Sequence, residues 1–95
     1  MMSENQIHVQ VKATGLLKEL SGDRIALKSR SSIQDCLNII LAKAKPNVRN
    51  LVIDQETGHL SSYIGIVVNG SLVEKLETEL DDGDELSLFI VISGG

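Results

Sequence analysis

The stretch LDDGDELSLFIVISGG, residues 80–95, contains a turn, a strand and two final glycines. Asp82-Gly83 is typical of a turn, and the alternation from residue 85 to residue 92 indicates a strand. One face of this strand carries Leu86, Leu88, Ile90 and Ile92, and the other carries Ser87, Phe89, Val91 and Ser93. The sequence therefore predicts an ordered strand that runs almost to Gly94 and Gly95.

A second strand and a tight turn precede this stretch. YIGIVVNG, residues 63–70, is apolar over nearly all of 63–68 and ends in Asn69-Gly70, which tolerates the positive φ angles of a hairpin turn. A short returning segment, SLVEKL, follows. Residues 47–62 show few periodic signals, so we expect mostly a connection there, with room for a short strand at 51–53.

The first half of the chain predicts a hairpin followed by a helix. Residues 7–13, IHVQVKA, alternate strictly, and RIALKS at 24–29 alternates in the same way, so the two segments form a pair of strands. GLLKEL at 15–20 is too short for a prediction. From 33 to 44 apolar residues recur at helical spacing.

The ends of this helix have their own signals. Ser32 is a good N-cap, and Asp35 three residues on resembles a capping box. Lys43 and Lys45 fall in the last turn, where they suit the helix dipole, and we expect Pro46 to stop the helix.

The order of elements is strand, strand, helix, strand, short strand and strand. This order predicts an α+β roll with a mixed sheet and one main helix across one face. We expect a single domain over residues 1–95, with 93–95 as a flexible, extended tail. One face of the sheet would then be covered and the other left open.

Composition excludes several kinds of partner. The net charge of −4 and the presence of only two aromatic residues, Tyr63 and Phe89, argue against nucleic acid. No apolar run approaches the roughly 20 residues that span a bilayer, and MMSENQ lacks the features of a secretory signal, so we expect a cytoplasmic protein and no membrane partner. The single cysteine, Cys36, forms no metal-ligand spacing with His8 or His59, so no metal is expected.

The two final glycines suggest a function for the strand before them. Two residues without side chains extend about 7 Å in extended conformation and can thread a channel too narrow for a Cβ atom. A carboxylate delivered in this way is a poor electrophile, so a partner must activate it, and ATP would do this through an acyl-adenylate. No nucleophile elbow, phosphate-binding glycine loop or zinc pattern is present, so the chain does not read as an enzyme on its own.

Four motifs carry a family resemblance: SSIQDCLNII, VVNG, LDDGDELSLF and the terminal SGG. The chain resembles the sulfur carriers of the MoaD and ThiS group, which share the β-grasp fold with ubiquitin. The resemblance covers nearly the whole chain and is most specific over 64–95. Its length and the segment 45–63 make it more similar to MoaD, the small subunit of molybdopterin synthase.

This resemblance implies a reaction cycle at Gly95. An E1-like enzyme would use ATP to adenylate the carboxylate of Gly95, a sulfur donor would convert it to a thiocarboxylate, and the sulfur would pass to a pterin precursor in the large synthase subunit. No permanently bound cofactor is implied. Gly94 carries over as the other glycine of the tail, and Phe89 aligns with an aromatic position before it. The chain reads IVIS where relatives often have a proline, which bears on partner identity.

Three functions remain open at this point. A ubiquitin-like modifier joined to lysines has the same ending, and so do carriers that serve thiamine or cysteine synthesis. A plain binding module would not use its glycines. We expect Phe89 and Val91 to face away from the core and, with Ser93 and Gly94, to contact partners, although a central strand buried on both faces would hide them.

The remaining reactive side chains suggest structural roles. Cys36 lies on the flank of the helical stripe and reads as a small core residue. His8 and His59 are expected to face solvent without a partner. The acidic residues between 74 and 85 read as a solvated turn, or as a surface that steers docking onto a basic partner.

Overall fold

A mixed sheet, two helices and a 3₁₀ turn make up the fold. The computed structural model describes residues 5–22 and 24–91. The elements are β1 (Gln6–Ala13), η1 (Gly15–Leu20), β2 (Ile25–Lys28), α1 (Ile33–Ala42), α2 (Pro46–Val52), β3 (Ile64–Val68), β4 (Ser71–Leu72) and β5 (Glu85–Ile90). The predicted tail at 93–95 lies outside the described residues, as does Ile92 of the predicted strand.

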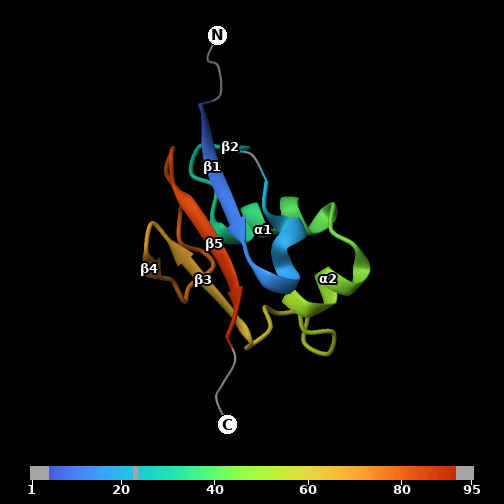
Figure 1. Ribbon diagram of the computed structural model, residues 1–95. Coiled ribbons are helices and arrows are strands. Elements are labelled where there is room, and N and C mark those ends of the chain that lie inside the picture. The colour runs from blue at the N-terminus through green and yellow to red at the C-terminus, as the bar shows by residue number, and fades with distance from the viewer. Residues whose placement is uncertain (1–4, 23, 92–95) are drawn as a thin grey trace.

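The strands form one sheet in the order β2-β1-β5-β3-β4. β1 and β5 are parallel, and the other neighbouring pairs are antiparallel. Figure 1 shows β5 beside β1 and β3, with both helices on the same side of the sheet. The predicted mixed sheet with a covered face is therefore confirmed, and Asn69-Gly70 forms the expected tight turn, with φ angles of 51° and 87°.

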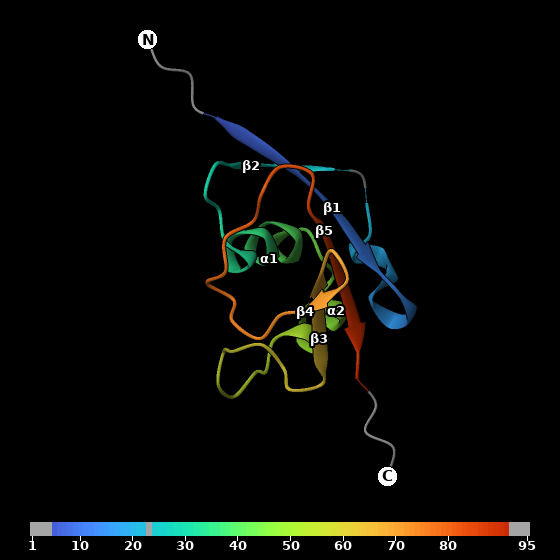
Figure 2. The ribbon, with the colours of Figure 1, turned by 90° about the vertical axis from the view of Figure 1, so that its left-hand side faces the viewer.

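The capping box at the start of α1 is present as predicted. The Asp35 amide donates to Ser32 Oγ at 3.1 Å, and the Ser32 amide donates to an Asp35 carboxylate oxygen at 2.9 Å. The loop between β4 and β5 also holds this end, because the Ile33 and Gln34 amides donate to the carbonyls of Thr78 and Leu76. Figure 2 shows this loop beside the start of α1.

The first helix ends at Ala42, before Pro46, but the prediction of a connection over 47–62 was wrong at 47–52, because Pro46 begins a second helix. Proline suits the first helical position, where its missing N–H is not needed and its fixed φ fits the helix. Val48 and Val52, four residues apart, are both buried. Arg49 joins α2 to α1 by donating to the carbonyls of Leu41 and Ala44. The described residues thus form two α-helices where one main helix was expected, and the possible strand at 51–53 is only a single bridge between Ile53 and Leu60.

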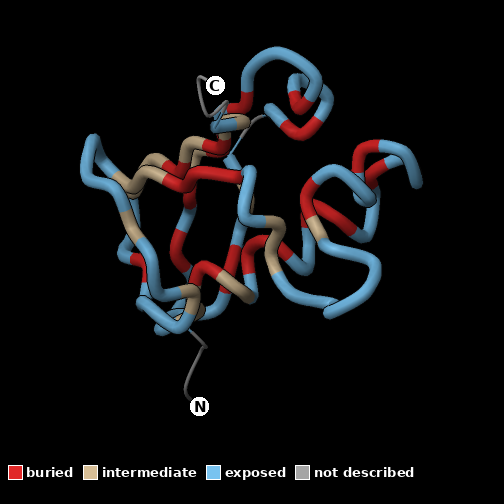
Figure 3. The backbone as a smooth tube through the Cα atoms, turned by 90° about the horizontal axis from the view of Figure 1, so that it is seen from below, coloured by how far each residue is buried: buried red, intermediate tan, exposed pale blue. Residues whose placement is uncertain are grey.

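The core lies between the sheet and the two helices. Figure 3 shows buried residues recurring along the inner segments and exposed residues along the outer loops. Among the described residues, every buried side chain belongs to a hydrophobic residue. The sheet contributes Ile7, Val9, Val11, Ala13, Leu27, Ile64, Ile66, Leu86 and Leu88, the helices and η1 contribute Leu17, Leu20, Ile33, Cys36, Leu37, Ile40, Leu41, Val48 and Val52, and Ala44 and Leu80 complete the core.

We expect Ser32→Ala to lower the free energy of unfolding by about 1 kcal/mol, because the substitution removes the acceptor for the Asp35 amide at the start of α1. Urea denaturation followed by circular dichroism measures this loss. Ser31→Ala is the matched control. The hydrogen bond that Ser31 accepts, from the Leu80 amide, goes to its backbone carbonyl, which the substitution keeps. Equal losses in the two variants would contradict the capping role.

Candidate functional site

The candidate site surrounds the end of β5, the strand that precedes residues 92–95 in the chain. The Val91 amide donates to the Tyr63 carbonyl at 2.6 Å, so the ladder between β3 and β5 continues one residue beyond Ile90. Val91 is the last described residue. Because β5 lies between β1 and β3, the tail is anchored to the centre of the sheet.

Side chains around this point form a largely apolar surface. Val91 is 44% exposed, as the sequence predicted, whereas Phe89 is only partly exposed. Phe89 is the cross-strand partner of Gly65 in β3, and its ring lies over that glycine. Neither helix covers this face, so the strand is not buried on both sides.

Two further residues of this surface, Leu16 and Tyr63, were not predicted from the sequence. Leu16 is 71% exposed and, with Phe89, lines a hollow of about 330 Å³. Tyr63, paired with Val91, is 63% exposed. We call Leu16, Tyr63, Phe89 and Val91 the root patch.

The position of Leu16 follows from the short 3₁₀ turn in which it lies. This turn buries Leu17 and Leu20, which are three residues apart, and leaves Leu16 on the outside. In the sequence, the three-residue spacing of Leu17 and Leu20 is the signal that could have predicted the outward position of Leu16. Tyr63 belongs to the predicted apolar strand 63–68, but in the structure it lies just before β3 and is exposed.

Two exposed polar pairs also lie on the open face of the sheet. Lys12 Nζ lies 2.8 Å from Glu85 Oε2, on neighbouring strands. His8, expected to lack a partner, has its Nδ1 3.6 Å from Asp82 Oδ1, and the same oxygen accepts a bond from the His8 amide. Both pairs are exposed, so water and salt screen them and they add little to stability. The open face therefore carries these polar pairs as well as the root patch.

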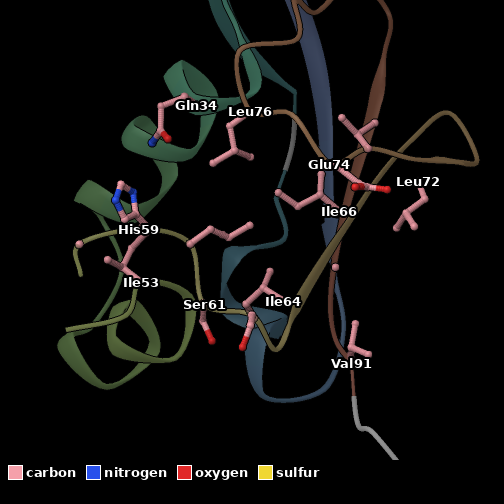
Figure 4. A pocket seen from close by; sticks show the side chains of 15 residues that line it. Gln34, Ile53, His59, Ser61, Ile64, Ile66, Leu72, Glu74, Leu76 and Val91 are labelled. Carbon is pink, nitrogen blue, oxygen red and sulfur yellow. The ribbon is translucent and has the colours of Figure 1, made fainter. Parts of the chain in front are cut away.

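A second hollow lies between β3 and the loop at residues 58–62. It has a volume of about 510 Å³, and Figure 4 shows Ile64 and Ile66 on one side of it and His59 and Ile53 on the other. Gln34 and Glu74 also line it, and Val91 lies at the tail end. His59 is in an exposed loop, as predicted. Gln34, His59 and Glu74 come from separate segments of the chain.

The described residues contain neither a candidate metal site nor a helix that could cross a membrane. Over 5–22 and 24–91, no three side chains of His, Cys, Asp or Glu come together in a way that could hold a metal ion. Over the same ranges, neither helix has the length and apolar character needed to cross a bilayer.

Cys36 is enclosed by the core, as predicted. Its side chain is fully buried in α1, and burial raises the pKa of the thiol to about 11. The thiolate is the form that attacks electrophiles and carries persulfide sulfur, and burial disfavours it. Cys36 is therefore a packing residue.

Comparison with known families identifies the chain. The model of the ThiS family matches residues 11–95, which include the root patch and the final glycines. The chain belongs to the ThiS family. The resemblance to ThiS and MoaD carriers is thus confirmed, and so is the ubiquitin-like β-grasp fold. No curated protein matches the chain significantly.

Several solved structures resemble this ThiS family member. Small archaeal modifier protein 1 of H. volcanii is 26% identical with a TM-score of 0.76, and the alignment covers 90% of this chain and 99% of that one. The protein of the same name from Methanosarcina acetivorans is 26% identical with a TM-score of 0.74, over 96% and 99% of the two chains. A complex of subunits 1 and 2 of molybdopterin-converting factor from Helicobacter pylori contains a chain 26% identical, with a TM-score of 0.55, over 94% and 100%.

We expect the buried thiol to make stability fall as the pH rises from about 9 to about 11, because the folded protein retains a proton that the unfolded chain releases. Comparing urea denaturation of the protein and Cys36→Ala across this range isolates the effect, since every other ionisable group is present in both. The variant should lose less stability over the range. Parallel curves would contradict a buried, protonated thiol.

Proposed function

We propose that this protein is a sulfur carrier that acts through Gly95. Its carboxylate attacks the α-phosphate of ATP on an E1-like enzyme, which releases pyrophosphate and forms an acyl-adenylate. A sulfur nucleophile then displaces AMP and leaves a thiocarboxylate at Gly95. The ThiS family match, which extends through Gly94 and Gly95, is the observation that supports this reaction.

The length of the tail supports a role for the root patch in docking. Four residues follow Val91, and in extended conformation they reach about 14 Å at most. The partner's active site must come within this distance of Val91 for the Gly95 carboxylate to react. A partner at this distance has to contact the surface around Val91. Phe89 and Val91 belong to the apolar part of that surface. Ser93 and Gly94 would line the partner's channel.

For the pathway, we propose molybdopterin biosynthesis. The support is the Helicobacter pylori complex, in which a relative of this chain is assembled with a second subunit of molybdopterin-converting factor. The acceptor for this chain would be a large synthase subunit that binds the root patch and receives the tail. A carrier for thiamine or cysteine synthesis would use the same chemistry at Gly95, so identification of the acceptor bound in cells distinguishes these pathways.

The second candidate is a protein modifier. The small archaeal modifier proteins from H. volcanii and Methanosarcina acetivorans support it, because both are 26% identical and match nearly the whole chain. A modifier would use the same adenylate but pass its carbonyl to a lysine amine. The product would then be an isopeptide bond on a larger protein.

We expect deletion of Gly94 and Gly95 to abolish ATP–pyrophosphate exchange by the E1-like enzyme of the same organism, because the carboxylate can no longer reach the nucleotide. The urea midpoint should stay unchanged, since the described core ends before these residues. A variant with alanine at both positions keeps the tail length and tests the channel, and we expect it to slow exchange. Unimpaired exchange after the deletion would contradict the proposal.

We expect the protein from its own cells to carry a mass increase of about 16 Da in its C-terminal peptide, because sulfur replaces one carboxylate oxygen. Intact and peptide mass spectrometry measure it, and alkylation separates a thiocarboxylate from an oxidised methionine. Lysine-linked adducts with an unmodified terminus would favour the modifier. An unmodified terminus without adducts would contradict both functions.

A further inference from the structure

We propose that Gly65 is a positioning residue for docking: its missing side chain lets the Phe89 ring lie on β3 and keeps the neighbouring hollow open to a partner. This inference rests on the proposed function of the root patch. It concerns a glycine outside the tail, in the middle of a strand.

The first observation is a close approach between the two residues. Gly65 and Phe89 are directly paired across β3 and β5. A Cβ atom on residue 65 would lie 2.5 Å from Phe89 Cζ, 2.6 Å from Cε2 and 3.1 Å from Cε1. Real Cβ atoms do not tolerate such distances, so the ring occupies the space that any other side chain would need.

Backbone conformation does not explain the glycine. Gly65 is not among the residues with a positive φ, unlike Gly70 and Gly83 in the turns. Glycine in the interior of a strand weakens it and often marks a close approach. Gly65 is buried although it points to the open face, because the Phe89 ring covers it. The observed reason for a glycine here is therefore space for the ring.

The position of the ring determines the shape of the root patch. Phe89 also forms one wall of the hollow of about 330 Å³, whose other lining residues are Thr14, Gly15, Leu16 and Ile90. A side chain at residue 65 would push the ring off β3, and the hollow is the open space beside it. The hollow can admit an apolar side chain of the partner only while the ring stays over Gly65.

Gly65→Ala tests this geometry in the full-length protein. We expect the KM for the carrier in ATP–pyrophosphate exchange to rise roughly tenfold, as when one anchor of an interface is lost, with kcat unchanged. Unchanged kcat would show that the bound tail still reacts. Gly22→Ala is the matched control, because Gly22 lacks a positive φ and a Cβ there would meet nothing within 4 Å. We expect its KM to equal that of the unmodified protein.

A double-mutant cycle with Phe89→Leu separates the ring from other effects. Leucine lacks Cζ and both Cε atoms, which are the atoms nearest to a Cβ at residue 65. We expect Phe89→Leu alone to raise the KM, and Gly65→Ala to have little further effect when added to it. An equal effect of Gly65→Ala in both backgrounds would overturn the inference, because the glycine would then act independently of the ring.

Two further outcomes distinguish this inference from the proposed function. An unchanged KM for Gly65→Ala, with a raised KM for Phe89→Leu, would overturn the role of Gly65 and leave docking through Phe89 intact. An unchanged KM for Phe89→Leu would overturn both the role of Gly65 and docking through Phe89. Loss of exchange on tail deletion would still support the proposed chemistry at Gly95. Proton NMR of the unmodified protein tests the geometry without a variant: an upfield ring-current shift of the Gly65 Hα protons is expected, and ordinary shifts would contradict it.

Discussion

The parallel pairing of β1 with β5 is the constraint on which the rest of the structure depends. It joins the first strand to the last in the middle of the sheet, with Val11 opposite Leu86 and Ala13 opposite Leu88. The Gln10 amide extends this contact by donating to the Asp84 carbonyl. Parallel strands cannot be joined by a tight turn, so the chain between β1 and β5 has to return along a face of the sheet. This connection includes both helices, which cover one face. It also includes β2, β3 and β4, which extend the sheet on either side of the β1–β5 pair.

The covered face and the open face have different roles. The helices and sheet enclose an entirely hydrophobic set of buried residues among those described, and Cys36 belongs to it. The open face carries the exposed Lys12–Glu85 ion pair, the exposed His8–Asp82 contact and the root patch. Since β5 is central and hydrogen-bonded as far as Val91, its tail begins at a fixed point beside that patch. A rigid strand that leads to a short tail limits where a partner can bind.

The carrier and modifier functions make the same demand on this structure. Both need a carboxylate that reaches a nucleotide in another protein, and they differ in the nucleophile that arrives afterwards. Neither needs a catalytic group on this chain. Under either proposed function, selection of the partner would depend on shape and polarity near the tail, such as the hollow beside Phe89 and the exposed Leu16. The exposed charges of Lys12 and Glu85 would affect the rate of encounter more than the fit.

The sequence by itself determined the elements that have strong local signals: the alternating strands, the tight turns and the capped start of α1. Local spacing is enough there, because burial repeats every two residues in a strand and every 3.6 in a helix. It also indicated the family. Pro46 was ambiguous, since proline both follows and begins helices, and only the packing of Val48 and Val52 shows which applies. The position of the Phe89 ring over Gly65 and the exposure of Leu16 depend on strand order and register, which bring together residues far apart in the chain; only the tertiary structure decides those contacts.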